Sequence, residues 1–264
     1  MRTKLIFNTA SIVGVLALLA SPLAIGQIAN TKHNLGSTGT GPNTTPATAE
    51  VCVFCHTPHG ADTSAAVPLW NKAIVPATYS TYADLNTSSL DGTITTVGSV
   101  SIACLSCHDG TQAMDSVLNA PGSGANPGRI GGLTGTGVDA NGLMSVGAGI
   151  ALIGTDLRND HPIGIQYGGG GITTATADSL ALLADQDFKV PTRATINGNV
   201  VWWIDADSDS NREKNEMQLY TRTIGANPEP FVECASCHDP HTTTTTFLRV
   251  ENTGSAVCLA CHTK

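Results

Sequence analysis

Aromatic and basic residues are both scarce in this chain of 264 residues. Phe, Trp and Tyr together make up 5% of the sequence. Aromatic side chains supply much of the buried area of an ordinary core, so this composition predicts that something other than side chains fills part of the interior. The 13 Lys and Arg residues are outnumbered by 21 Asp and Glu residues. A surface with this charge argues against nucleic acid and anionic lipid as partners.

Long apolar runs are absent after residue 26. Before that point, Arg2 and Lys4 precede a short apolar stretch, and residues 24–26 have a small-x-small sequence. This pattern predicts a secretory signal peptide over residues 1–26 that is cleaved from the mature chain, and retention as an uncleaved anchor is the alternative. We therefore expect an exported protein, extracellular or at the cell surface, with the periplasm as the alternative location. No membrane span is expected after cleavage.

Cysteine is absent outside four copies of one pattern, Cys-x-x-Cys-His, which use all eight cysteines. Two thiols at this spacing can form thioethers with the vinyl groups of one porphyrin, and the adjacent histidine becomes the proximal ligand of the iron. The sequence therefore predicts four haem c groups. The thioether residues are Cys52 and Cys55, Cys104 and Cys107, Cys234 and Cys237, and Cys258 and Cys261, and the proximal ligands are His56, His108, His238 and His262.

Zinc and disulfide bonds are the alternatives for a cysteine pattern of this kind. A zinc site built from two Cys-x-x-Cys pairs has no need of a histidine after each pair, and every pair in this chain has one. A disulfide framework does not require a constant gap of two residues followed by histidine. The regular pattern therefore favours haem over both alternatives.

Eight histidines match the eight axial positions of four haem irons. Since four of them are the proximal ligands, the others are predicted distal ligands, and all four irons are predicted to have two histidine ligands. The predicted distal ligands are His33, His59, His161 and His241. Methionine is the rival distal ligand, and the candidates are Met114, Met144 and Met217.

Two of the predicted distal ligands occupy the same position in their motifs. His59 and His241 each follow a proximal histidine by three residues, directly after a proline. Proline favours an extended conformation in the residue before it, so these histidines are predicted to turn away from their own haem and to bind a neighbouring one. His33 and His161 are expected on loops, as distal ligands of the first and second haems respectively.

The four motifs form two pairs with similar flanking residues, which indicates an internal duplication of a two-haem unit. We predict a single tetrahaem cytochrome domain over residues 27–264. Its two haem-pair units span residues 31–120 and 231–264. They are joined by a loop region at residues 121–171, which holds 16 of the 28 glycines, and by a segment at residues 172–230.

Regular structure is predicted to be sparse. The expected fold class is a mostly coil, irregular multihaem cytochrome c with short helices and few short strands, in which the haems form the core. Each motif predicts a short helical turn, because its three functional side chains must share one face. Residues 200–204 predict a strand, residues 217–221 another brief element, and residues 181–188 a short helix. The polar tract at residues 242–246 is expected to be an exposed linker.

Residues 205–216 place side-chain oxygens at positions 1, 3, 5, 9 and 12 of a twelve-residue loop. This is the spacing of a calcium loop. Ser210 stands at position 6, where such loops have glycine, and no flanking helices are predicted. Calcium binding is therefore one hypothesis, and a solvated acidic turn is the other. The candidate ligands are Asp205, Asp207, Asp209, Glu213 and Glu216.

Short segments around the motifs resemble one known family. They are Lys32-His33-Asn34-Leu35, Cys55-His56-Thr57-Pro58-His59, Leu69-Trp70-Asn71, Cys107-His108-Asp109-Gly110, His161-Pro162-Ile163-Gly164 and Cys237-His238-Asp239-Pro240-His241. In this order they are similar to the tetrahaem extracellular cytochromes that polymerise into conductive filaments. The similarity covers most of residues 30–264, apart from the glycine-rich middle. It implies loop-dominated subunits, bis-histidine haems and one histidine donated to a haem of the next subunit, for which we predict His59, with His33 as the alternative.

Three functions are consistent with these patterns. The first is an electron carrier, not an enzyme, that passes electrons outward through closely spaced haems in a filament. Its partners would be further copies of itself, upstream and downstream redox proteins, and extracellular electron acceptors. The second is a monomeric periplasmic or secreted tetrahaem shuttle. The third is a multihaem reductase with an open haem, which the match of histidines to axial positions argues against.

Overall fold

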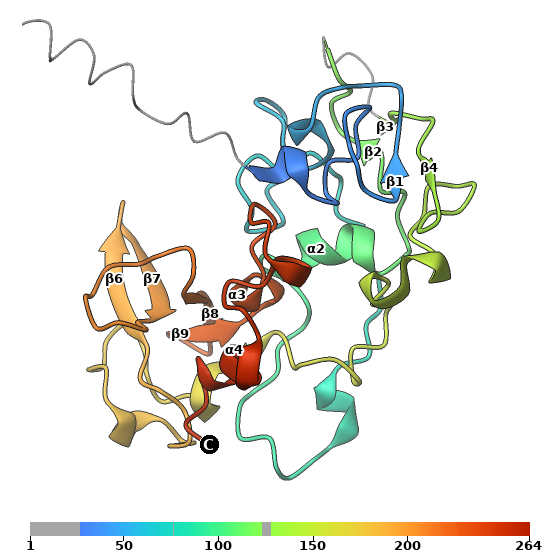
Figure 1. Ribbon diagram of the computed structural model, residues 1–264. Coiled ribbons are helices and arrows are strands. Elements are labelled where there is room, and N and C mark those ends of the chain that lie inside the picture. Colours follow the sequence, from blue (N-terminus) through green and yellow to red (C-terminus); the bar gives the residue numbers. More distant parts are fainter. Residues whose placement is uncertain (1–26, 76, 123–127) are drawn as a thin grey trace, which may run out of the picture.

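The computed structural model describes residues 27–75, 77–122 and 128–264. The predicted signal peptide lies outside the described residues. Figure 1 shows the largest sheet toward one end of the molecule and short ladders joined by long loops toward the other, with α2 (Ser101–His108) and α3 (Cys234–Cys237) between them. The described helices include none that is long and apolar enough to cross a membrane.

The largest sheet is antiparallel and has the strand order β5-β9-β8-β7-β6. Its strands are β5 (Ile165–Gln166), β6 (Thr192–Ile196), β7 (Asn199–Ile204), β8 (Met217–Ile224) and β9 (Asn227–Val232). The strand predicted at residues 200–204 is confirmed as β7, and the brief element predicted at residues 217–221 lies within β8.

A tight turn connects β6 and β7, and a longer loop connects β7 and β8. Between β6 and β7, Asn197 and Gly198 have φ angles of 50° and 80°. Positive φ at both central residues matches the twist of the flanking strands in a two-residue hairpin, and Asn-Gly tolerates it best. Strands β7 and β8 are instead joined by the acidic loop of residues 205–216, whose two ends are brought together by the pairing of Ile204 with Met217.

Two small ladders cross the glycine-rich region. Strand β1 (Asn43–Thr44) pairs with β4 (Thr134–Gly135), and β2 (Ser116–Val117) pairs with β3 (Gly128–Arg129). The region predicted as a loop at residues 121–171 contains short strands and 3-10 helices in its described part. The 3-10 helices of the chain are Gln27–Asn30, Cys52–Phe54, Tyr82–Leu85, Val146–Ala151, Tyr167–Gly169, Leu180–Leu182, Thr245–Phe247 and Thr253–Ser255.

The short helix predicted at residues 181–188 is wrong. Only a 3-10 turn at Leu180–Leu182 forms there. The backbone N–H groups of Ala184 and Asp185 donate to the carbonyl oxygens of Gly170 and Gly168, at 3.2 Å and 2.9 Å. These tertiary hydrogen bonds replace the ones that a helix would have made within the segment.

Three apolar clusters among the described residues each border cysteines of the motifs. The cluster on the sheet contains Trp202, Met217 and Leu219 and packs against Cys237 and Cys261. A second cluster, which includes Phe54, Met114 and Met144, packs against Cys55 and Cys107, and a third, around Trp70 and Ile102, packs against Cys55. The packed side chains therefore meet at the positions where the motifs lie.

Candidate cofactor site

The four motifs share one local geometry. The backbone N–H of His56 donates to the carbonyl of Cys52 at 2.8 Å, and His238 and His262 make the same bond to the first cysteine of their motifs. Cys104 and His108 lie within one helix, α2. One helical turn brings both cysteines and the histidine to the same side, so the predicted helical turns are confirmed at all four motifs.

Motifs that follow one another in the sequence are neighbours in space, and the first motif also meets the segment after the third, where His56 faces His241. The first and second motifs meet where Cys55 and Cys107 pack against the same apolar cluster, and the third and fourth meet where Cys237 and Cys261 do so. The second and third are joined through α2 and α3. All four attachment sites therefore form one continuous series.

A buried hydrogen-bond network holds the second and third motifs together. The Ser101 hydroxyl of α2 donates to the Glu233 carboxylate at 2.5 Å, and the Cys234 N–H donates to the Ser101 oxygen at 2.9 Å. Arg222 donates to the other carboxylate oxygen of Glu233 at 3.1 Å. Burial raises the pKa of Glu233, and Ser101 and Arg222 oppose that rise. A hydrogen bond to Cys234, followed by burial, raises the pKa of Cys104, so the sulfur atoms of the two motifs lie close together.

His56 of the first motif faces His241. Their ring centroids lie 6.2 Å apart and the ring planes differ by 17°. A metal–imidazole bond is about 2 Å long, so two imidazoles on opposite faces of one metal ion have ring centres about 6 Å apart. The pair therefore has the spacing of two axial ligands. This agrees with the expectation that His241 serves a haem other than that of its own motif.

His108 of the second motif faces His33. The centroids lie 6.1 Å apart with an angle of 82° between the planes. This placement differs from the sequence-based assignment of His33 to the first haem. The reason is that Phe247, which is far away in the sequence, stacks on the His33 ring at 4.3 Å and holds it beside α2. Burial lowers the pKa of His33 to about 4, so the ring is neutral and able to bind a metal at neutral pH.

His262 of the fourth motif shares a cavity with His161. The cavity has a volume of about 250 Å³ at the edge of the large sheet, and Tyr167 and Phe188 also line it. Burial lowers the pKa of His262, and the nearby His161 adds to that effect. His161 was assigned to the second haem on sequence grounds, but its position here favours the fourth motif. The loop carrying it is tied to the sheet because Gly164 donates its N–H to Val232 at 2.8 Å.

His238 and His59 are the two histidines left over. Both are exposed, and neither has a ring partner within the described part of the chain. The backbone carbonyl of His59 accepts hydrogen bonds from Thr57 and from Asn119, at 3.1 Å and 2.8 Å. The backbone at His59 is therefore held in place, while its side chain is exposed.

Three of the proximal histidines are oriented by backbone carbonyls. The Nδ1 atoms of His56, His108 and His238 contact the carbonyl oxygens of Pro68, Ala151 and Thr246 at 2.7–2.8 Å. A carbonyl only accepts hydrogen bonds, so Nδ1 carries the proton and Nε2 keeps its lone pair. This is the tautomer that coordinates a metal through Nε2.

Three of the half-buried motif cysteines are poor thiolate ligands. Burial raises the pKa of Cys55 and Cys261 to about 12 and that of Cys237 to about 11. A zinc site or a redox dithiol needs thiolates, which positive surroundings would favour. Thioether formation leaves no charge on sulfur, so the apolar surroundings of these cysteines suit haem attachment better than either alternative.

The residues present fit haem c. Three buried side-chain nitrogen atoms have no hydrogen-bond partner among the described residues. Nδ1 of His33 and Nε1 of Trp70 lie beside the histidine pairs, and Nε1 of Trp203 lies in the large sheet. Such orphaned groups mark places where a further group belongs. Trp70 and Phe247, which contact His56 and His33 respectively, were not identified as site residues from sequence. The methionines considered as rival ligands are buried in the apolar clusters.

The carboxylates of the acidic loop come together as the calcium hypothesis requires. Oxygen atoms of Asp205, Asp207 and Asp209 lie within 4.8 Å of one another, and so do those of Asp207, Glu213 and Glu216. Burial and then the neighbouring carboxylates raise the pKa of Glu213. However, both oxygens of Glu216 already accept backbone N–H groups, from Ala206 at 2.8 Å and Glu213 at 2.9 Å. These bonds would also stabilise a solvated acidic turn, so both hypotheses stand.

Calcium binding to this loop can be measured directly. If the calcium hypothesis holds, the purified protein retains calcium after dialysis against ordinary buffer, and removal by a chelator lowers its unfolding temperature. Asp207 belongs to both groups of carboxylates, so Asp207→Asn should weaken calcium binding at least tenfold in calorimetric titration. Asp160→Asn, outside the loop, is the control. Protein free of calcium after dialysis, with no response to added calcium, would leave the acidic turn as the explanation.

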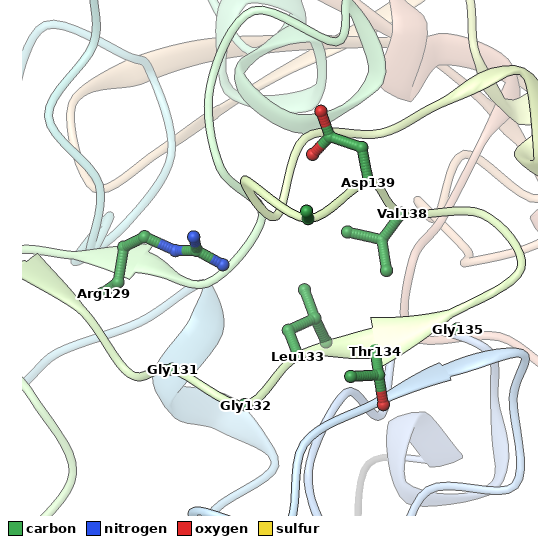
Figure 2. A pocket seen from close by; sticks show the side chains of 9 residues that line it. Arg129, Gly131, Gly132, Leu133, Thr134, Gly135, Val138 and Asp139 are labelled. Carbon is green, nitrogen blue, oxygen red and sulfur yellow. The ribbon is translucent and has the colours of Figure 1, made fainter.

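Figure 2 shows a second hollow in the glycine-rich region, with a volume of about 500 Å³, lined by Arg129, Leu133, Val138, Asp139 and the intervening glycines. Neither histidine nor cysteine lines it. The Arg129 guanidinium is occupied by the buried Asp115 carboxylate at 2.8 Å. This hollow is therefore separate from the histidine pairs and presents little free polar chemistry.

Comparison with protein families supports the interpretation of the motifs. The family described as "Doubled CXXCH motif" matches residues 229–264, which contain the third and fourth motifs. The comparison with curated proteins gives no match. The doubled motif indicates a c-type multihaem cytochrome, which binds haem c and acts in electron transfer. Eight cysteines accommodate at most four such groups.

Proposed function

We propose that this protein is an exported tetrahaem cytochrome whose subunits polymerise into a conductive filament and carry electrons outward. Haem c supplies one-electron redox chemistry at each motif. The haem groups would occupy the spaces that the three apolar clusters border, and would complete a core that has few aromatic side chains. The polypeptide would orient the axial imidazoles and exclude water from them.

The observation that carries this proposal is a structural difference between two histidines that occupy the same position in their motifs. Both side chains are exposed, but the His241 ring centroid lies 6.2 Å from that of His56, whereas His59, at the same position of its own motif, has no ring partner among the described residues. His238 likewise lacks a partner there. Each subunit is thus left with one histidine that can bind an iron of another subunit, His59, and with one predicted iron that lacks a distal ligand, at His238. His59 of one subunit can complete the axial pair of His238 on the next, which generates a head-to-tail, open-ended assembly.

His33, the alternative donor, fits this role less well. Its ring is buried between His108 and Phe247. The continuous series of motifs also supports conduction, because an electron entering at one end would meet the four sites in sequence order. A joint between the third motif and His59 beside the first motif would connect the sites of one subunit with those of the next, and the fourth site would lie to one side of this path. Redox proteins and extracellular electron acceptors would be the partners at the filament ends.

The unpartnered His238 also favours a second candidate function. If no second subunit supplies a ligand, the third iron would have one open axial position and could bind a small oxidant, as in a multihaem reductase. A monomeric shuttle with all irons six-coordinate is less favoured, because His59 would then have to reach His238 within one chain. The predicted signal peptide supports export for all three candidates.

Microscopy and spin-state measurement on the native protein separate these candidates. A filament predicts polymers in negative stain, four haems per chain by pyridine haemochrome assay, and low-spin iron throughout. A reductase predicts monomers with one high-spin haem that binds cyanide or nitrite. A shuttle predicts monomers with only low-spin haems. Either monomeric result would overturn the filament proposal.

The angles between paired rings predict two kinds of EPR spectrum. Low-spin ferric haems with near-parallel imidazole planes give rhombic spectra, and near-perpendicular planes give highly anisotropic ones. The 17° pair of His56 and His241 should therefore give a rhombic signal, and the 82° pair of His33 and His108 an anisotropic one. His33→Ala is expected to remove the anisotropic signal selectively. Loss of a rhombic signal from that variant would show that the pairs are assigned wrongly.

A further inference from the structure

Lys72 is a deeply buried basic residue. Its charge has no role in the site described above. Only 1% of its surface is exposed. Its ammonium group donates to the carbonyl oxygens of Ala113 and Ser116, at 2.8 Å and 2.9 Å. An ammonium has three N–H donors, so one remains beyond these two bonds. Burying a charge of this kind is costly unless an opposite charge lies close by.

No carboxylate of the described residues lies within 4.0 Å of this ammonium. The nearby acidic side chains are engaged elsewhere. Asp115, which lies between Ala113 and Ser116 in the sequence, is fully buried. Its carboxylate is paired with Arg129 at 2.8 Å. Asp109 accepts hydrogen bonds from Tyr79 and Thr111. Within the described part of the chain, the groups that contact the positive charge of Lys72 are therefore the two carbonyl oxygens.

The segment that carries Lys72 lies against the first motif. The preceding residue, Asn71, donates its backbone N–H to the Cys55 carbonyl at 2.9 Å, and its side chain donates to Val53 at 2.6 Å. These bonds fix the segment against the first motif. The ammonium group itself binds the segment of Ala113 and Ser116, and Met114 of that segment packs in the apolar cluster that borders Cys55. Through its two carbonyl partners, Lys72 also anchors the segment that follows the second motif.

We propose that Lys72 raises the reduction potential of the haem bound at the first motif and makes it the preferred electron acceptor of the series. Reduction adds one electron to the iron and forms no bond, so the net charge at that site becomes more negative by one. A buried cation stabilises this more negative state, and the low dielectric of the interior strengthens the effect. The inference rests on the proposed haem at the first motif, but it does not require a filament.

Three substitutions test the charge separately from the packing. Lys72→Gln keeps an N–H donor for the carbonyls and removes the charge, Lys72→Met also removes the hydrogen bonds, and Lys72→Arg keeps the charge. In spectroelectrochemical titration of the full haem-loaded protein, Lys72→Gln and Lys72→Met should lower the ferrous-to-ferric ratio of the first haem about tenfold at a given potential. This corresponds to about 59 mV for one electron. Lys72→Arg should leave it near the wild-type value.

Two control variants identify the haem that responds. His241→Met marks the first haem, since methionine ligation raises its potential. Lys189→Gln makes the same change of charge at an exposed lysine near Cys261 and should leave the first haem unaffected. The proposal is overturned if the first haem keeps its potential in both neutral variants, or shifts equally in Lys72→Arg. It is also overturned if only Lys72→Arg retains four haems, because Lys72 would then be a structural anchor. The haem count and polymer state of the wild-type protein test the proposed function independently.

Discussion

Replacing His59 by alanine is expected to abolish filaments and to leave monomers that contain one high-spin haem. The proposed joint consists of the His59 ring bound to the iron held by His238 of the next subunit. Without that ring, the joint and the sixth ligand of the third iron are lost together. Negative-stain microscopy and low-temperature EPR measure the two effects on the same sample.

The matched control is His241→Ala. His241 occupies the same place after its proximal histidine as His59 does, but its ring faces His56 of the same chain. This variant should also show one high-spin haem, yet it should still form filaments. Added imidazole should return the His59→Ala protein to the low-spin state without restoring polymers, since free imidazole fills the ligand position and cannot join two subunits. Normal filaments from His59→Ala, with every haem low-spin, would sink the proposal.

Replacing Glu233 by alanine is expected to destabilise the protein by about 3 kcal/mol, because breaking a buried ion pair leaves an uncompensated charge. Glu233 is 1% exposed and links Ser101 of α2 to Arg222. We expect a value at the lower end of the usual range, since 17% of the Arg222 side chain is exposed and water can reach it. Denaturant unfolding, followed by haem absorbance and by the fluorescence of the three buried tryptophans, gives the free energy.

Glu233→Gln and a surface pair serve as controls for this effect. Glutamine keeps the shape and can still accept from Ser101, so its cost should be smaller than that of alanine. Asp156→Asn, which breaks the exposed pair with Arg158, should cause no measurable change. Equal stability of the Glu233→Ala variant and the wild-type protein would mean that α2 and α3 are held together by other contacts.

The pH dependence of stability gives a further check on Glu233. Burial raises its pKa, so the folded chain holds the proton more tightly than the unfolded chain does. The stability linked to this carboxyl is therefore greatest below its ordinary pKa and is lost as the pH rises through the raised value. Glutamine does not titrate. The stability difference between Glu233→Gln and the wild-type protein should accordingly shift in favour of the variant as the pH rises through that range.

Some expectations about the fold failed for identifiable physical reasons. The segment at residues 181–188 lacks a helix because glycine carbonyls elsewhere in the chain take its N–H groups. Strand β9 was not anticipated because it contains Pro228 and Pro230, and proline cannot donate to a ladder. In the structure, β5 pairs only with Phe231 and Val232. The prolines thus lie in a part of β9 that has a strand on one side only.

The sequence alone determined the attachment chemistry of this protein. Two cysteines and a histidine within five residues must share one helical turn, so their joint role follows from local geometry wherever the motif lies in the fold. The same local reasoning identified β7, whose β-branched and aromatic residues favour an extended backbone. Counting histidines against axial positions likewise required no structure.

Only the tertiary structure decided which histidines face one another. His33 lies beside His108, and His56 beside His241, although long loops separate the members of each pair in the sequence. Loops of this length reach many positions at similar entropic cost, so spacing cannot choose among them. The choice depends on contacts such as Phe247 stacking on His33. For the same reason only the folded chain distinguishes His59 from His241, and reveals that Lys72 is buried with no carboxylate of the described residues within 4.0 Å of its ammonium group.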